Sequence, residues 1–161
     1  MSTRSERLAQ RIEQGAANLA AFAEGLSEAQ WNTPVPPDGR TAGVIIHHVA
    51  SVYPIEVQLA SVLASGKPVE GVTWAGIAEM NAKHAQEHTG TGKTETIELL
   101  RRNSAAAAHA VRAFTDDELD SAAPLSLNSN APLTAQFMIE DHALRHSWHH
   151  LEIIRAALDA A

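Results

Sequence analysis

The sequence predicts an all-α fold, a four-helix bundle with one additional short helix. Alanine is abundant and aromatic residues make up only 4% of the chain, a composition that favours helices. Apolar residues recur at three- and four-residue spacing over long segments, whereas the apolar–polar alternation typical of strands is nearly absent. With 161 residues, the chain has room for one core, and we expect residues 1–161 to form a single domain.

Four segments have the length and apolar periodicity of long helices. They extend over residues 5–26, 41–64 and 94–114, and from 132 to the C-terminus. In the first, Leu8, Ile12 and Leu19 fall on one face. In the second, Thr41 is suited to cap the first turn, while Pro54 should bend or locally loosen the helix because it lacks a backbone N–H. Helices of this kind bury their apolar faces against one another, which gives a bundle.

Shorter elements connect the long helices. A short helix is predicted from about Trp74 to His88. Residues 115–119 fit a capped single turn, because Thr115 is followed three positions later by Glu118, as in a capping box. Proline, glycine and small polar residues predict loops at 32–39, 89–93 and 124–132.

Composition excludes several classes of function. The chain has no cysteine, so any bound metal must be held by imidazole and carboxylate groups. The net charge is −7 and no basic stripe is visible, which argues against nucleic-acid binding. No apolar run approaches the roughly 18 residues that a membrane span requires, and the N-terminal residues do not resemble a signal peptide. We therefore expect a cytoplasmic protein that does not bind membranes.

Nine histidines are present, and four of them lie close together near the C-terminus. His142, His146 and His150 follow one another at i, i+4 and i+8, a spacing that places them on one helix face, on or beside the apolar side. His149 lies at the edge of that face. Two imidazoles one turn apart can bind one metal ion, and a third ligand from a neighbouring helix would complete the site. The alternative is that these histidines line a solvated groove.

A further pair of adjacent histidines occurs in the second predicted helix. Consecutive helical residues are rotated by roughly 100°, so they cannot both face inward. His48 shares the apolar stripe of Val44 and Val52, whereas His47 does not, so His48 is predicted to face the core. A lone inward histidine is commonly a neutral residue bonded to a carbonyl group. Several buried imidazoles together favour a metal, since each unpaired polar group costs about 1–3 kcal/mol.

The remaining histidine pair, His84 and His88, also has i, i+4 spacing. Its neighbours are polar, and include Asn81, Lys83 and Glu87. We therefore predict that this pair lies at a solvated helix end, in preference to a second metal site.

The segment Val44-Ile-Ile-His-His48-Val-Ala, together with His146-x-x-x-His150, resembles the DinB-like (YfiT-like) superfamily. The similarity extends over most of the chain, including Ile77–Asn81 and Phe114–Leu119. The resemblance implies an up-down-down-up bundle, frequently homodimeric, with a divalent metal bound by His48, His146 and His150. Zinc fits best, with nickel, iron and manganese as alternatives. One departure is Leu151-Glu152-Ile153, where many members have Arg-Gly-Gln.

Characterised members include transferases and isomerases that use mycothiol, bacillithiol or glutathione. The leading hypothesis is therefore a metal-dependent transferase that activates a low-molecular-weight thiol against a small-molecule substrate. A hydrolase that activates water is an alternative. So is a non-catalytic metal-binding protein, with His142 or Glu56 as a fourth ligand, and so is a metal-free bundle that acts through dimerisation. Glu56, Asp141 and Glu152 are candidate acids for orienting a ligand.

Overall fold

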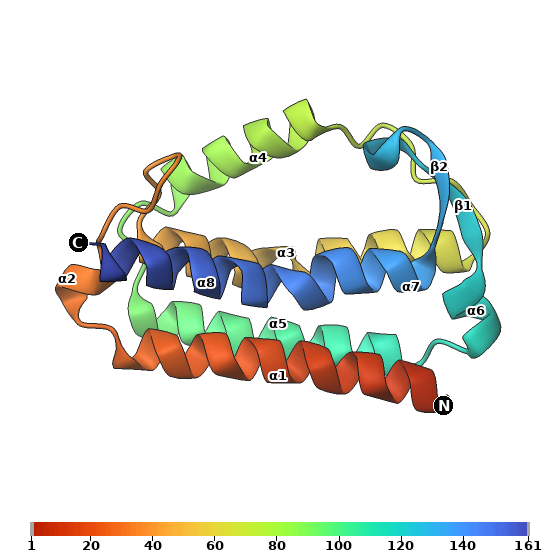
Figure 1. Ribbon diagram of the computed structural model, residues 1–161, viewed down its shortest axis with the longest axis horizontal. Helices are drawn as coiled ribbons and strands as arrows, with labels where there is room; N and C mark the ends of the chain where they lie inside the picture. The colour runs from red at the N-terminus through yellow and green to blue at the C-terminus, as the bar shows by residue number, and fades with distance from the viewer. Residues whose placement is uncertain (1, 161) are drawn as a thin grey trace.

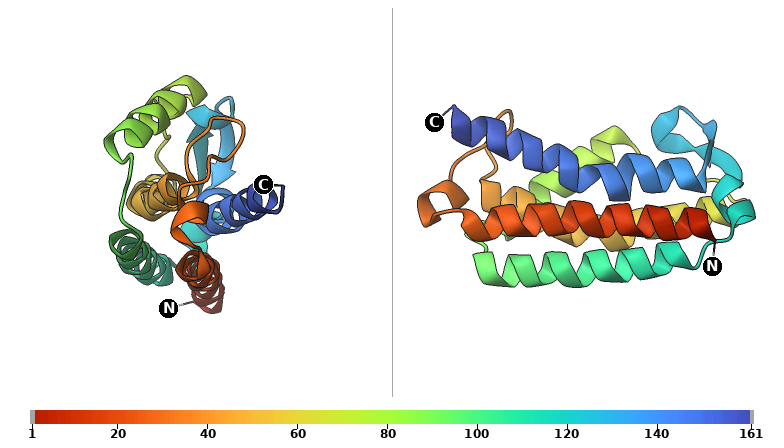
Figure 2. Two further views of the ribbon diagram at one scale, coloured as in Figure 1. Left: turned by 90° about the vertical axis from the view of Figure 1, so that its left-hand side faces the viewer. Right: turned by 60° about the horizontal axis from the view of Figure 1, so that its bottom comes forward.

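Four long helical segments lie side by side in the computed structural model, which describes residues 2–160 (Figure 1). They are α1 (Thr3–Gly25), α3 (Ala42–Ala64), α5 (Lys93–Arg112) and a C-terminal segment made of α7 (Ala135–Met138), a π-helical stretch (Ile139–Leu144) and α8 (Arg145–Asp159). α1 and the C-terminal segment run in one direction, and α3 and α5 run in the other (Figures 1 and 2). The predicted up-down-down-up bundle is confirmed.

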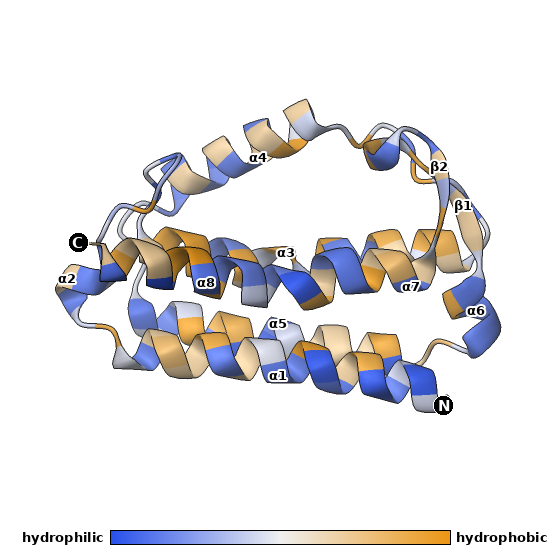
Figure 3. Ribbon diagram, viewed as in Figure 1, coloured by the Kyte–Doolittle hydropathy of each residue, from blue (hydrophilic) through white to orange (hydrophobic). Residues whose placement is uncertain are grey.

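α3 is the most apolar of the long helices, as its long orange stretches in Figure 3 show. It packs against α5 and the C-terminal segment, and the shorter α4 lies along its remaining side. A helix that is apolar on most sides is buried on most sides. α1 instead has one buried stripe, which includes the predicted Leu8, Ile12 and Leu19, and packs mainly on α5.

The entrance to α3 is fixed by a short helix that the sequence did not predict. α2 (Glu28–Trp31) begins with a capping box between Ser27 and Gln30. Trp31 packs so closely on Gly43 that a Cβ atom there would collide with the indole ring. The indole Nε1 also donates a hydrogen bond to the carbonyl oxygen of Thr91, at 3.0 Å. These contacts hold the first turns of α3, where His47 and His48 lie.

α3 continues without interruption through Pro54, so the predicted loosening does not break the helix. Proline removes the N–H that would bond the carbonyl of residue i−4, which is Ala50. The side-chain amide of Asn103, on α5, donates to that carbonyl at 2.8 Å. A neighbouring helix thus supplies the missing hydrogen bond.

α4 (Trp74–Glu87) connects α3 to α5 and crosses the outside of the bundle in the opposite direction to both (Figure 1). None of its residues is buried. The predicted bounds, Trp74 to His88, are nearly those observed. The predicted capped turn is also present as α6 (Asp116–Asp120), where Thr115 and Glu118 form both hydrogen bonds of a capping box.

The predicted loop at 124–132 is wrong, because this region forms an antiparallel hairpin. Its strands are β1 (Ala122–Leu125) and β2 (Ala131–Thr134), separated by a short 3-10 turn (Ser126–Asn128). Pro124 and Pro132 face each other across the pair, and Val69 bonds to the outer edge of β1. Strands of four residues are too short to show a reliable alternation. The last helix accordingly begins at Ala135, capped by Thr134, and not at Pro132.

Candidate metal centre

Three histidines from two helices converge on one point. His48 comes from the second turn of α3, and His146 and His150 come from consecutive turns of α8. The ring centroid of His48 lies 5.0 Å from that of His146 and 5.7 Å from that of His150, and the last two centroids are 4.7 Å apart. One nitrogen of each ring lies within 4.8 Å of the others. The structure therefore brings together the three residues selected from the sequence.

A buried carboxylate orients one of the three rings. Glu56 lies two turns beyond His48 on α3, and only 6% of its surface is exposed. Its Oε1 accepts a hydrogen bond from Nδ1 of His146 at 2.6 Å. With the proton held on Nδ1, the Nε2 lone pair of His146 is free to bind a ligand.

The other two candidate acids do not serve this purpose. Asp141 accepts a hydrogen bond from Arg145 at 3.1 Å, and Glu152 pairs with Arg155 on the exposed side of α8. Neither bonds to His48, His146 or His150. Of the three acids considered from the sequence, Glu56 is the one that bonds to a histidine of the converging group.

Burial lowers the pKa of two histidines of this group. Desolvation, aided by the nearby His146, lowers the pKa of His48 to about 3. The same two causes lower the pKa of His150 to about 2. Neutral imidazole is the form that binds metals. The local environment therefore keeps His48 and His150 in the neutral form near neutral pH.

The donor set fits a divalent metal ion. Within the described chain, three polar atoms around this point are buried without a hydrogen-bond partner: Nδ1 of His150, Nε2 of His142 and Oε2 of Glu56. Leaving such atoms unpaired costs about 1–3 kcal/mol each, so the arrangement is explained better by a ligand than by packing alone. Imidazole nitrogens with a nearby carboxylate suit zinc and similar ions.

A cavity of about 460 Å³ adjoins the three histidines. Its walls come from α3, α4 and the C-terminal segment, and most of its surface is apolar. Its apolar lining includes Val52, Ile55, Leu59, Ile77, Met80 and Met138. Its polar lining includes Arg40, Glu56, Asp141, His142, Arg145 and His149. This volume falls within the range typical of small-molecule sites.

The sequence model of the DinB superfamily matches residues 11–154, which include His48, His146 and His150. The chain belongs to the DinB superfamily. Among solved structures, YfiT from Bacillus subtilis matches with a TM-score of 0.75 and 18% identity, over 98% of this chain and 87% of that one. It is described as a probable metal-dependent hydrolase with an unusual four-helix bundle topology. At this identity the likeness shows a shared fold.

Comparison with curated protein sequences gives no significant match. Within residues 2–160, no helix has both the length and the apolar character needed to cross a membrane.

His142 occupies a distinctive position in this DinB-superfamily chain. It lies in the π-helical stretch immediately before α8 and lines the cavity without joining the three converging rings. Burial lowers its pKa, against the opposing effect of Glu56. π-Helical turns occur often at functional sites, where the extra residue changes the direction of a side chain. His142 is thus a residue of the cavity wall.

The prediction for His84 and His88 needs correction, because the two residues do not simply face solvent. Both turn toward α3, where they meet His47. Nδ1 of His47 lies 2.9 Å from Nε2 of His84, and the rings of His47 and His88 are stacked with centroids 4.0 Å apart. The polar sequence around the pair indicated an exposed surface. It carried no signal that α4 crosses α3 at this point.

Proposed function

We propose that this protein is a metal-dependent hydrolase of a small molecule, and that His48, His146 and His150 hold one divalent ion. The proposal rests mainly on the convergence of three imidazoles at the wall of a large cavity. Buried Glu56 orients one of these imidazoles. The description of YfiT supports the same reaction class. Zinc is the metal best suited to this donor set, and nickel, iron and manganese are alternatives.

A divalent ion held by His48, His146 and His150 would supply a Lewis acid that activates water for hydrolysis. The chain supplies the remaining functions. Glu56 holds the proton on Nδ1 of His146 and so maintains the ligand tautomer. His142 lines the cavity, and its buried Nε2 has no hydrogen-bond partner among the described residues.

The cavity indicates the kind of substrate. Apolar side chains from α3 and α4 form its walls and exclude water from them. Among the polar residues of the lining, Arg40 is engaged through Nε with Asp38, while its Nη1 is buried without a partner among the described residues. A largely apolar molecule with one anionic or strongly polar group, placed next to the bond to be hydrolysed, would match both features.

The thiol-dependent transferase is the second candidate. The cavity of about 460 Å³ is far larger than a single water requires, and can hold a thiol cosubstrate beside an electrophile. Because the chain has no cysteine, the sulfur nucleophile must come from outside. Mycothiol, bacillithiol and glutathione are the cosubstrates to test.

Metal analysis tests the shared part of both candidates. His146→Ala should lower the bound metal by one equivalent per chain, because it removes one ligand and separates Glu56 from the site. His109→Ala is the matched control, since His109 is exposed on α5, away from the cavity. Equal metal content in the two variants would exclude the proposed ligand set.

Cobalt-loaded protein distinguishes the candidate reactions. A thiol that binds at the open position should produce a sulfur-to-cobalt charge-transfer band, and this result would favour the transferase. Turnover of ester or amide substrates that is lost in His146→Ala, without a thiol-induced band, would favour the hydrolase. If neither response is observed, the non-catalytic alternative, with Glu56 or His142 as fourth ligand, replaces both.

We also propose a homodimer. Ser104, Ala107 and Ala108 are buried within the bundle, whereas Ala105 and Ala106 remain exposed and permit close approach of a second helix. Light scattering should give twice the chain mass of 17.2 kDa. A mass equal to that of one chain would contradict the proposal.

A further inference from the structure

The second histidine group, His47, His84 and His88, joins α4 to α3. One nitrogen from each ring lies within 4.8 Å of the others, as in the first group. No residue is common to the two groups. His47 and His48 are consecutive residues of α3 that belong to different groups, and the rings of His48 and His84 make an edge contact with centroids 5.6 Å apart. The two groups are therefore neighbouring but separate clusters.

The spacing within the second group is close to that of metal ligands. Two nitrogens bound to one tetrahedral zinc ion at 2.0–2.1 Å lie about 3.3 Å apart. The observed separation between Nδ1 of His47 and Nε2 of His84 is 2.9 Å, so a small displacement of two side chains would suffice. All three rings are half-buried, which leaves a path for an ion to enter.

The hydrogen bonds of the group leave it incompletely satisfied. The hydroxyl of Ser51 donates to the carbonyl oxygen of His47, and its Oγ also lies 3.3 Å from Nδ1 of the same residue. Nδ1 of His84 is buried and has no partner in the described part of the chain. The nearby carboxylate of Glu87 is exposed and faces Lys83, so it does not fill this role. An ion bound by Nδ1 of His47 and Nε2 of His84 would replace the hydrogen bond between them, and the proton of His84 would then lie on its Nδ1.

We propose that His47, His84 and His88 form a second divalent-metal site. Three imidazoles without a thiolate or carboxylate favour late first-row ions such as zinc, nickel, copper or cobalt. Because His84 lies in the last turn of α4, His88 is the C-cap of that helix and His47 belongs to α3, the ion links the end of α4 to the bundle.

This link has a consequence for the cavity. α4 has no buried residue of its own, yet its first two turns supply Trp74, Ile77 and Met80 to the cavity wall. Trp74 and Met80 remain 65% and 40% exposed. A helix with so little buried surface opens easily. A metal ion at its C-terminal end therefore holds the wall of the cavity in place.

Cobalt titration of the metal-free protein, followed by metal analysis, tests the second site. We expect two equivalents per chain in the wild type and in His109→Ala, one in His84→Ala, one in His146→Ala, and none in the double variant. Equal binding by wild type and His84→Ala would overturn the inference. One wild-type equivalent that disappears in His84→Ala but persists in His146→Ala would support the second site and overturn the catalytic site instead.

Hydrogen exchange tests the link to α4. Saturation of the wild type with cobalt should slow amide exchange in residues 74–88 beyond the level reached with one equivalent of cobalt. In His84→Ala, cobalt beyond the first equivalent should not slow exchange further. Unchanged exchange in the wild type would overturn the role assigned to the ion. Circular dichroism of each metal-free variant verifies folding, and His88→Gln gives the same readouts if His84→Ala does not fold.

Discussion

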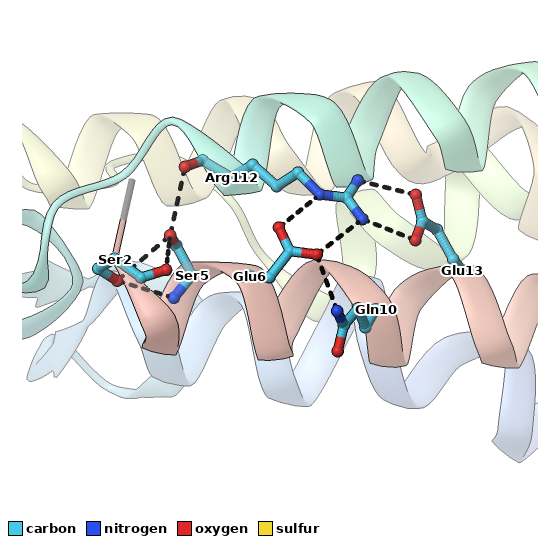
Figure 4. Close-up of polar contacts among 6 residues, drawn as sticks. All are labelled: Ser2, Ser5, Glu6, Gln10, Glu13 and Arg112. Carbon is cyan, nitrogen blue, oxygen red and sulfur yellow. Dashed lines mark hydrogen bonds and ion pairs between the residues drawn. The ribbon is translucent and has the colours of Figure 1, made fainter.

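The Arg112 cluster and the histidine cluster of α3 and α8 both bridge helices, and they differ in how completely their groups are paired. In the first, the guanidinium of Arg112 on α5 binds Glu6 and Glu13 on α1 through four hydrogen bonds of 2.8–3.3 Å (Figure 4). The backbone carbonyl of Arg112 also accepts a bond from Ser5. Every charge in this cluster has an opposite charge beside it.

The histidine cluster of α3 and α8 is built in the opposite way. His48 is buried and His150 is half-buried, desolvation lowers the pKa of both, and Nδ1 of His150 and Oε2 of Glu56 lack partners within the described residues. A paired network contributes to folding, whereas unpaired buried groups lower stability unless a ligand binds them. The Arg112 cluster therefore joins helices with its charges paired, whereas the histidine cluster leaves groups unpaired, in accord with the metal site that we propose there.

The strongest test of this contrast is Glu56→Gln. Glutamine keeps the size of the side chain but removes the charge that holds the proton on His146, so metal affinity should fall by about 10–100-fold. Competition with a chromophoric chelator measures the change. Glu152→Gln is the matched control, because Glu152 is exposed on α8 and pairs only with Arg155. Equal affinities in the two variants would show that Glu56 does not assist the site.

Asn103→Ala tests a second fully paired contact between helices. The substitution would leave the carbonyl of Ala50 without the bond that Pro54 cannot supply, and should lower the free energy of unfolding by about 1–3 kcal/mol. Urea unfolding measures it. Arg102→Ala, at an exposed position on the same helix, should change stability far less. If both variants unfold at the same urea concentration, the hydrogen bond from the Asn103 amide to the carbonyl of Ala50 does not contribute to stability.

Arg112→Gln should lower stability less than Asn103→Ala does, with a decrease of a few degrees in Tm. The effect is small because the cluster is accessible to solvent and screened by salt. The decrease should shrink as salt is added. Calorimetry at low and high salt provides the measurement, with Arg155→Gln as a control for an ion pair within one helix. A salt-independent decrease would indicate lost packing instead of lost charge pairing.

The same cluster predicts a pH dependence. Hydrogen bonding to Arg112 lowers the pKa of Glu6 and of Glu13 below the ordinary value of 4.5. Their contribution to stability is therefore present above pH 4.5 and lost as the pH falls through the lowered values. The Tm difference between wild type and Arg112→Gln should be constant from neutral pH to about 5 and then diminish. A difference that grows with acid would contradict the pairing.

Part of this protein could be predicted from the order of its residues. Apolar periodicity located the four long helices and placed His48, but not His47, on the inward face of its helix. The spacing of His146 and His150 predicted two rings on one face. These properties depend on the 3.6-residue repeat of a single helix, and each is confirmed by the helix that contains it.

Only the tertiary structure decided which faces meet. Glu56 reaches His146 because α3 and α8 run in opposite directions at this depth of the bundle, and His84 reaches His47 because α4 crosses α3. The hairpin of residues 122–134 likewise depends on pairing between strands too short to be recognised separately. A helical repeat fixes directions around one axis, but contacts across helices depend on the relative height and rotation of two axes, which packing of the whole core determines.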